Sequence, residues 1–501
     1  MEEIVFEYIN EVYIKITASK SVMKELENEF CYWVPGYRHM PKYKAGIWDG
    51  RFRMIRSFDT KLYVGLLPLI EKFCKERKYK IIYRNCDYRK ENEIDEKNIE
   101  EFCLSQNICV KDKKSGDYVD ITPRDYQINS VYQSVKNKRI VLLAATSAGK
   151  TLICYLLSKY LLNNSYNRGL IIVPRVDLIT QLFNDFKEYS NKNKWDVDEN
   201  VHKIYSGQDK YKDSSLIVST YQSLANVQNP EKFFSKFDFV IVDETHQGSN
   251  KSISDILKMC VNAKIRVGMT GTLKDNEKVN NLVIQSLLGE SYNVITAKES
   301  IDRGESTKLE VKCYLLEHEN REFGSYEHEL KFIEKLEERN EFICNLCGKI
   351  DRNILVMFKH VEHGKILYEK IKNKYNDRKV HFYYGDIKQK ERERIKSEIE
   401  LDKNCIVLAT DATFSTGLNI KSLNDLILAC PYKSNITIQQ AAGRLLRINK
   451  GKHKVTVHDI GDDFDGNTTY KHFKTRIGIY KKQEFPYKVY KVNINEWFTN
   501  W

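Results

Sequence analysis

The sequence lacks the long apolar runs that a membrane-spanning protein needs. No stretch of its 501 residues approaches the roughly 18 consecutive apolar residues of a membrane-spanning helix. The first residues, MEEIVFEY, are acidic and do not follow the basic-then-apolar order of a secretory signal peptide. We therefore expect a cytoplasmic protein without a membrane partner.

The sequence also lacks a zinc-ribbon arrangement of cysteines and any low-complexity tract. Its 12 cysteines are scattered, and some, such as Cys405 and Cys430, lie in apolar runs. Cys344 and Cys347 form a CxxC pair, but no second pair follows at zinc-ribbon spacing, and the pair lies in a helical pattern. We interpret the cysteines as reduced core thiols and do not expect a structural metal.

Basic residues outnumber acidic ones, 81 to 69, which gives a net charge of +12. This balance favours an anionic partner, with nucleic acid as the leading candidate, although a basic cytosolic protein without such a partner can have the same charge. Apolar residues make up 42% of the chain and charged ones 30%, as expected for globular domains with real cores.

The stretch from Arg139 to Thr151, RIVLLAATSAGKT, has the most informative local pattern. Ile140 to Ala144 predicts a short buried strand, and 152–162 predicts a helix after a loop of small residues. Strand, small-residue loop, Lys-Thr and helix are the context of a phosphate-binding P-loop. The predicted phosphate-binding residues are Thr146, Ser147, Ala148, Gly149, Lys150 and Thr151.

Two residues of this loop carry its chemistry. Lys150 can reach the β- and γ-phosphates of a nucleotide, and the hydroxyl of Thr151 can bind Mg²⁺. The pattern departs from the usual one at Ala144, where a P-loop normally begins with glycine. Taken alone, the stretch is also compatible with a tight strand-to-helix turn that carries a surface lysine.

Short apolar runs recur along the rest of the chain, separated by helical patterns. They are 140–144, 170–173, 216–219, 239–242 and 265–269, followed by 354–358, 381–384, 406–409, 426–429 and 455–458. Continuous runs are typical of strands buried on both faces of a parallel sheet. The sequence therefore predicts an α/β protein with two similar parallel-sheet lobes, at residues 118–305 and 306–501, after a small α/β module at 1–117.

Two carboxylates follow one of these runs directly. The apolar run 239–242 leads into Asp243 and Glu244, and we expect this strand to lie beside the P-loop strand. A carboxylate at the end of such a strand holds Mg²⁺ in P-loop NTPases, a role we assign to Asp243. Glu244 is then the general base that activates the attacking water. An acidic strand-to-helix cap is the alternative for either carboxylate alone.

The ordered motifs resemble those of superfamily 2 helicases of the DExH type. The matching segments are Arg124–Gln127, 146–151, 173–181, 219–224, 243–246, 270–272, 357–360, 410–417 and 440–447. Each segment alone is a weak signal, whereas their order over roughly 330 residues is specific. The resemblance implies two RecA-like lobes and ATP with Mg²⁺ as cofactors.

The same resemblance implies roles for individual residues. Arg124 and Gln127 belong to the adenine-reading segment, and Gln440, Arg444 and Arg447 belong to the arginine-finger motif. Their spacing also predicts that these last three residues share one face of a helix. The coupling motifs are represented by His246, Thr270, Thr272, Thr410 and Gly417. Residues of the strand-gripping motifs are Arg175, Gln222, Lys359 and His360.

The N-terminal module contains a stretch in which aromatic and basic residues alternate. Residues 32–61 hold seven Lys and Arg, two acidic residues and seven aromatic residues. Residues 48–50 predict a tight turn and 51–56 a strand. Cations and flat rings suit phosphate neutralisation and base stacking, but a hairpin whose rings fill its own core would have the same pattern. The predicted DNA-binding residues here are Arg38, Lys44, Trp48, Arg51 and Arg53.

A narrower resemblance includes this module. The segments 36–38, 44–53, 146–150 and 358–364 are similar to those of the UvsW helicases of tailed phages. That family implies an ATP-dependent DNA helicase that acts on Holliday junctions, forks and R-loops in recombination, repair and replication. It also implies a monomer in the bacterial host cytoplasm, with DNA or an RNA–DNA hybrid as substrate and recombination or single-strand-binding proteins as partners.

Three other functions remain open from the sequence. The nearest is an RNA helicase or a duplex translocase that separates no strands. A second is an ATP-gated DNA clamp, which would not need Glu244. A third is a restriction-type motor subunit with a nuclease, for which the sequence shows no separate carboxylate–lysine cluster.

Overall fold

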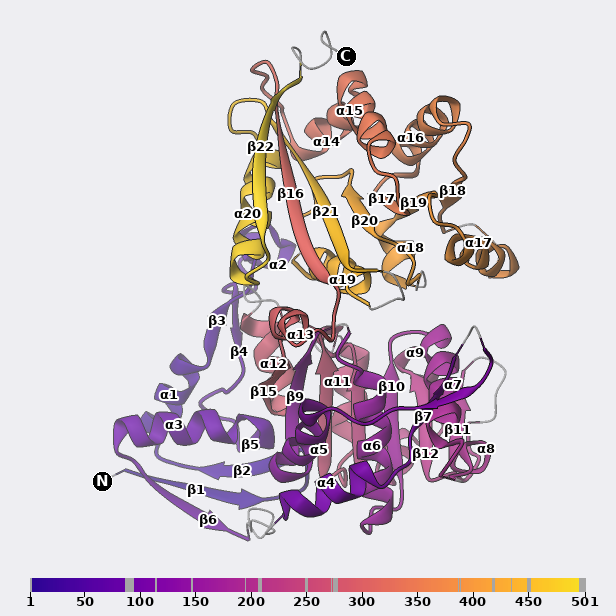
Figure 1. Cartoon of the computed structure of the whole chain (residues 1–501). Coiled ribbons are helices and arrows are strands. Elements are labelled where there is room, and N and C mark those ends of the chain that lie inside the picture. Colours follow the sequence, from indigo (N-terminus) through magenta and orange to yellow (C-terminus); the bar gives the residue numbers. More distant parts are fainter. Residues whose placement is uncertain are drawn as a thin grey trace. The chain divides into compact units, whose positions relative to one another are not determined.

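The computed structural model describes residues 2–85, 94–112, 115–145, 147–193, 195–205, 210–247, 251–271, 273, 278–385, 387, 389–416, 420–433, 435–447 and 452–494. Its contacts divide the chain into two compact units (Figure 1). One contains Met1–Ala144 and Ala148–Val294, and the other contains Ala145–Ser147 and Ile295–Trp501. None of the helices in these described ranges is long and apolar enough to cross a membrane.

The N-terminal part of the first unit is a four-stranded sheet with two covering helices. The strands β1 (Glu3–Tyr8), β2 (Tyr13–Thr17), β5 (Lys61–Tyr63) and β6 (Lys80–Arg84) lie in the order β5-β2-β1-β6. The apolar sides of α1 (Lys20–Glu29) and α3 (Leu67–Arg77) complete its core. Ser19 caps α1 by accepting from the Val22 N–H. Glu11 and Arg139 form a largely buried ion pair that ties this module to the first lobe.

The first lobe is a seven-stranded sheet between two helical layers. Its strands are β9 (Arg139–Ala144), β10 (Gly169–Val173), β11 (Val201–Ile204), β12 (Leu216–Thr220), β13 (Phe239–Asp243), β14 (Ile265–Thr270) and β15 (Glu290–Ile295). One face packs against α5 (Asp125–Asn137), α6 (Lys150–Asn163) and α7 (Val176–Ser190). The other face packs against α10 (Pro230–Phe234), α11 (Lys251–Met259) and α12 (Lys278–Leu288).

The second lobe also contains a seven-stranded sheet. Its strands are β16 (Lys308–Glu317), β17 (Ile354–Phe358), β18 (Val380–Tyr383), β19 (Ile406–Thr410), β20 (Asp425–Leu428), β21 (Lys454–Asp463) and β22 (Tyr487–Asn493). Its helices include α14 (Tyr326–Lys335), α15 (Glu337–Gly348), α16 (Val361–Lys374), α17 (Gln389–Leu401), α18 (Asp411–Thr416), α19 (Asn435–Leu445) and α20 (Thr468–Lys482). All ten predicted core strands of the two lobes are therefore confirmed.

The two sheets have the same strand order. The first is β11-β12-β10-β13-β14-β9-β15 and the second is β18-β19-β17-β20-β21-β16-β22, so each strand has a counterpart seven strands later in the chain. The strand pairs recorded within both sheets are parallel, for example β10 with β12 and β17 with β19. The lobes are thus two copies of one topology, and their equivalent loops can be compared directly.

That comparison separates the roles of the lobes. β9 leads into the P-loop, whereas its counterpart β16 leads into HENREFG, which has no Lys-Thr pair. β13 ends in two carboxylates, whereas its counterpart β20 is followed by Ala429 and Cys430. The Lys-Thr pair of the P-loop and the Asp243-Glu244 pair therefore have no counterpart directly after β16 and β20.

The structure differs from the sequence-based expectations for the lobes in two respects. β14 lies between β13 and β9, so the carboxylate strand is not the direct neighbour of the P-loop strand. Four strands of the two lobes were not predicted, namely β11, β15, β16 and β22. β16 and β22 carry alternating or polar residues, which lack the continuous apolar signal of buried strands.

A buried ion pair fastens the carboxyl ends of the second sheet. Arg339 on α15 donates through Nε to both carboxylate oxygens of Asp462, each at 2.9 Å, and through Nη1 to the Ala429 carbonyl at 3.0 Å. His318 Nε2 lies 3.1 Å from the same carboxylate. Both charged side chains are fully buried. Burial alone would raise the pKa of Asp462, but Arg339 and His318 outweigh it and lower that pKa.

Candidate nucleotide and nucleic-acid sites

The P-loop turns into α6 at a glycine that no other residue could replace easily. Gly149 has a φ of 76°, which favours glycine, and stands at the N-cap of α6. A Cβ there would lie 2.4 Å from Nε2 of Gln127. The Gln127 amide donates to the Ala148 carbonyl at 2.9 Å and accepts from the Arg124 N–H at 2.9 Å. Gln127, the predicted adenine-reading residue, thus supports the P-loop. To contact a base it would have to give up these two hydrogen bonds.

Glu244 faces the P-loop lysine because of an unusual backbone turn. Its φ is 51°, a left-handed value that is rare for a residue with a side chain and that clusters at functional sites. Its Oε1 lies 3.6 Å from Lys150 Nζ, and its Oε2 lies 3.2 Å from His246 Nδ1. The turn after β13 therefore brings the predicted general base and the predicted phosphate ligand together.

Asp243, the last residue of β13, is poised to bind a cation. Burial and the neighbouring Glu244 raise its pKa to about 6, although Lys150 acts in the opposite direction. Its Oδ1 is buried and has no hydrogen-bond partner among the described residues. An orphaned buried carboxylate oxygen is costly unless something else binds it. The residues thus fit a magnesium ion held by Asp243 and the hydroxyl of Thr151, the second residue of α6.

A hydrogen bond connects the acidic motif to the next strand. His246 Nδ1 lies 3.1 Å from the Thr270 hydroxyl, at the end of β14, and Thr270 is fully buried. The carboxylate, the imidazole and the hydroxyl therefore form one chain of contacts from Glu244 to Thr270. Such a chain can transmit a change at the phosphate site to the loop that follows β14.

In the second lobe, Arg444 lies on α19 and Arg447 lies beyond it. Arg444 Nη1 donates to the Phe414 carbonyl of α18 at 2.6 Å. The prediction that Arg444 and Arg447 share one helical face is wrong, because α19 ends at Leu445. Thr307, at the start of the second lobe, binds the chain just beyond α19. Its N–H donates to the Leu446 carbonyl and its hydroxyl donates to the Arg447 carbonyl, in place of further helical hydrogen bonds.

Several predicted residues are not tested by the structure. Thr146, Thr272 and Gly417 lie outside the described residues, as does the side chain of Gln440. Thr410 is buried, and its hydroxyl accepts from the Thr413 N–H at 3.2 Å, so it caps the start of α18.

The predicted strand-gripping residues follow the carboxyl ends of strands in both lobes. Arg175 is bound to Asp177 at 3.3 Å, whereas Gln222 is exposed on the short helix α9 (Tyr221–Leu224). Lys359 is exposed directly after β17. His360 Nδ1 lies 2.9 Å from Glu334, a partner that no sequence motif indicated. These positions are consistent with one nucleic-acid surface on each lobe.

In the N-terminal module, β3 (Cys31–Trp33) and β4 (Arg51–Arg53) form a separate antiparallel ribbon. The guanidinium of Arg51 lies 4.5 Å from the centre of the exposed Trp33 ring. Arg53 instead pairs with Asp49 at 2.5 Å and with Glu27 at 3.2 Å. The Trp48 indole donates to the Arg51 carbonyl at 2.9 Å, which closes the turn.

The remaining basic residues of this ribbon point into solvent. Arg38 and Lys44 are exposed on the connection between the strands, which contains η1 (Tyr37–His39) and α2 (Pro41–Lys44). The structure thus divides the predicted DNA-binding set of this module. Arg38, Lys44 and Arg51 are presented outward, whereas Arg53 and Trp48 hold the ribbon in shape.

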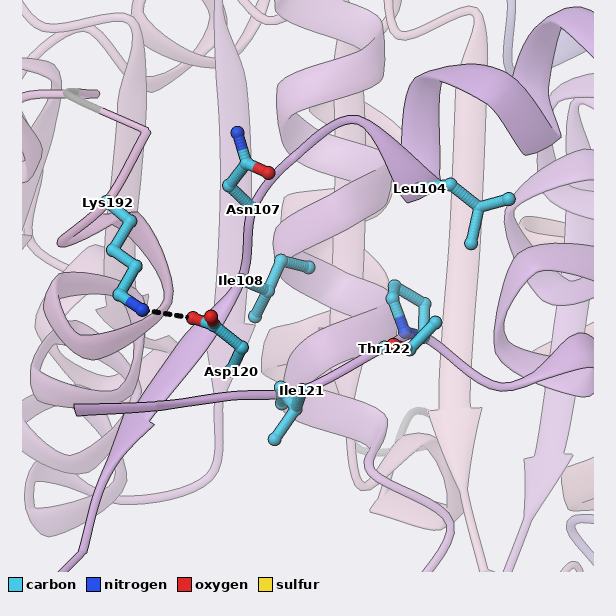
Figure 2. A pocket seen from close by; sticks show the side chains of 8 residues that line it. Leu104, Asn107, Ile108, Asp120, Ile121, Thr122 and Lys192 are labelled. Atoms are coloured by element: carbon cyan, nitrogen blue, oxygen red, sulfur yellow. Dashed lines mark hydrogen bonds and ion pairs between the residues drawn. The ribbon is translucent and has the colours of Figure 1, made fainter.

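The first unit also has a cavity of about 530 Å³ at the β7–β8 ribbon (Cys109–Lys111 and Tyr118–Asp120). Figure 2 shows its lining, which includes the ion pair of Asp120 and Lys192 and the apolar side chains of Leu104 and Ile108. None of the predicted site residues is among those that line it. This cavity is therefore separate from the candidate nucleotide site.

Comparison with known protein families gives three matches along the chain. The family described as "DNA helicase UvsW, N-terminal" matches residues 3–84. "Type III restriction enzyme, res subunit" matches residues 120–275, and "Helicase conserved C-terminal domain" matches residues 338–449. The matches follow the order of the N-terminal module and the two lobes.

Individual proteins agree with this order. The ATP-dependent DNA helicase uvsW of Enterobacteria phage T4 is 33% identical over 96% of this chain and 98% of its own length. The crystal structure of T4 UvsW matches with a TM-score of 0.52 and 30% identity, over 98% of this chain and all of that chain. The DNA 3′-5′ translocase XPB2 of Sulfurisphaera tokodaii is 32% identical over 36% of each chain. The chain therefore belongs to the UvsW family of superfamily 2 ATP-dependent DNA helicases.

Proposed function

We propose that this protein uses ATP hydrolysis to remodel branched DNA, namely junctions, forks and R-loops, in the host cytoplasm during phage recombination, repair and replication. The observation that carries the proposal is the cluster of Lys150, Glu244 and Asp243 at the ends of β9 and β13, in a chain related along its length to an ATP-dependent DNA helicase. Monomeric action, and help from recombination or single-strand-binding proteins, are part of the same proposal.

The contact between Lys150 and Glu244 supports a specific sequence of events. In this structure the two charges neutralise each other at 3.6 Å. A triphosphate competes for the lysine, which releases the Glu244 carboxylate to orient a water and accept its proton. Mg²⁺, held by Asp243 and Thr151, would neutralise charge on the β- and γ-phosphate oxygens. Arg444 and Arg447 of the second lobe supply positive charge to the phosphates. To do so, Arg444 gives up its hydrogen bond to the Phe414 carbonyl.

A panel of substrates tests the proposal. Strand displacement and branch migration are measured with and without ATP on a Holliday junction, a fork, an R-loop, plain duplex DNA and duplex RNA. We expect ATP-dependent conversion of the branched DNA substrates. Faster unwinding of RNA would indicate an RNA helicase, and ATP hydrolysis without strand movement would indicate a duplex translocase or an ATP-gated clamp.

The two arginines of β4 should affect DNA binding differently. We expect Arg51→Ala to lower DNA affinity and to reduce the slope of log K against log salt concentration by about 1, the value for one lost phosphate contact. Arg53→Ala should leave that slope unchanged, because Asp49 and Glu27 already occupy Arg53. The measurement is a salt titration of duplex binding by fluorescence anisotropy. A slope that falls only with Arg53→Ala would show that Arg53, rather than Arg51, contacts phosphate.

A further inference from the structure

The connection between β3 and β4 is a rigid knob rather than an open loop. The Trp33 and Tyr37 rings stack with centroids 4.6 Å apart, and Tyr43 meets Tyr37 edge-on at 4.8 Å. Gly50 is buried against Tyr37, where a Cβ would lie 2.4 Å from the ring, and its φ is 80°. The rings therefore pack on one another and fix the backbone of residues 34–50, which we call the knob.

The knob presents an apolar side chain that the fold does not use. Ile47 is 77% exposed, so its burial contributes little to stability. Its N–H donates to the Lys42 carbonyl at 3.0 Å, which fixes its backbone. A β-branched side chain also has few rotamers. Ile47 is thus held in a defined position with its side chain in solvent.

The surroundings of Ile47 indicate what it contacts. Residues 31–53 contain five basic side chains and a single carboxylate, Asp49, which Arg53 neutralises. Arg38, Lys42 and Lys44 are exposed on the knob. A protein partner with an apolar patch does not require this excess of cations on the knob, whereas phosphate backbones do. Charge complementarity therefore favours nucleic acid as the occupant of this surface.

We propose that Ile47 is a wedge that packs against or between base pairs at the branch point, while the surrounding cations bind the flanking phosphates. This proposal rests on the proposed function and names the feature that selects its substrate. Apolar side chains can enter DNA by unstacking a base step. Unstacking costs least where pairing already ends, so the wedge favours a fork or junction over continuous duplex.

The test uses the full chain and a fork that carries 2-aminopurine in the last base pair before the branch. Fluorescence of the probe rises when that base is unstacked, and it is read on binding without ATP. We expect the wild type and Ile47→Leu to raise the fluorescence. Ile47→Ser should bind the fork with similar affinity, give no such rise, and lose about ten-fold in strands separated per ATP hydrolysed.

A matched control is Leu401→Ser. Leu401 is 85% exposed at the end of α17, but acidic residues flank it in the sequence, so its loss should change neither readout. A wild-type protein that binds the fork without a fluorescence rise, or an Ile47→Ser variant that matches the wild type in both readouts, would overturn the wedge. If the probe responds as expected but no branched substrate is remodelled, the wedge holds and the proposed function fails.

Discussion

Replacing Lys150 by alanine should abolish DNA-stimulated ATP hydrolysis while leaving DNA binding largely intact. Lys150 begins α6, and its Nζ lies 3.6 Å from Oε1 of Glu244. Removing one preorganised donor from a site of charge development typically costs about 10²–10³ in rate. Here the loss also leaves the carboxylates of Asp243 and Glu244 without the neighbouring lysine charge, so binding of an anionic nucleotide should weaken as well.

The measurement is steady-state ATPase activity with and without forked DNA, together with DNA binding by anisotropy. Lys187→Ala serves as the control, because Lys187 lies on α7 of the same lobe, forms an exposed ion pair with Asp198 at 2.6 Å and lies over the Phe183 ring. It should keep wild-type turnover. Undiminished hydrolysis by the Lys150 variant would show that residues 146–151 do not bind the phosphates of ATP. The proposed ATP-driven function would then fail as well.

The second large effect concerns stability rather than catalysis. Arg339→Met should lower the free energy of unfolding of the second lobe by about 3–5 kcal/mol, because it leaves a buried carboxylate without its counter-ion. Asp462 is fully buried and, among the described residues, would retain the His318 imidazole as its recorded side-chain partner. The Ala429 carbonyl would also lose its donor. The measurement is urea denaturation followed by circular dichroism.

Two further variants show whether the buried charge is the cause. Arg339→Met combined with Asp462→Leu should recover part of the loss, because an apolar pair of similar volume needs no counter-ion. Lys370→Ala removes a partly exposed lysine that pairs with Glu337 and Glu341 across α15 and α16, and it should cost at most about 1 kcal/mol. Equal losses from the buried and exposed substitutions would contradict the argument.

The sequence predicted the core of each lobe well, because strands buried on both faces need continuous apolar residues. The runs at 239–242 and 354–358 became β13 and β17 almost residue for residue. Prediction failed where one side of a strand remains polar. β22, with the sequence YKVYKVN, lies at the sheet edge and is largely exposed, so its pattern does not differ from that of a surface segment.

The candidate site was predictable as a set of residue types but not as a set of partners. Lys150, Asp243 and Glu244 stand out because each follows a buried strand at a motif position. Nothing in the sequence indicates that Arg53 is occupied by Asp49 and Glu27, because Glu27 lies on α1, far from β4 along the chain. Likewise, nothing in the sequence indicates that His360 pairs with Glu334.

By itself, the sequence determined the fold class, the family and the types of group at the candidate nucleotide site, since these depend on local apolar runs and on short motifs. Only the tertiary structure decided that the two sheets share one strand order, that a left-handed turn directs Glu244 toward Lys150, and that Ile47 stands exposed on a rigid knob. The reason is physical: strand order, side-chain pairing and exposure arise from contacts between residues distant in the chain, and no local pattern encodes them.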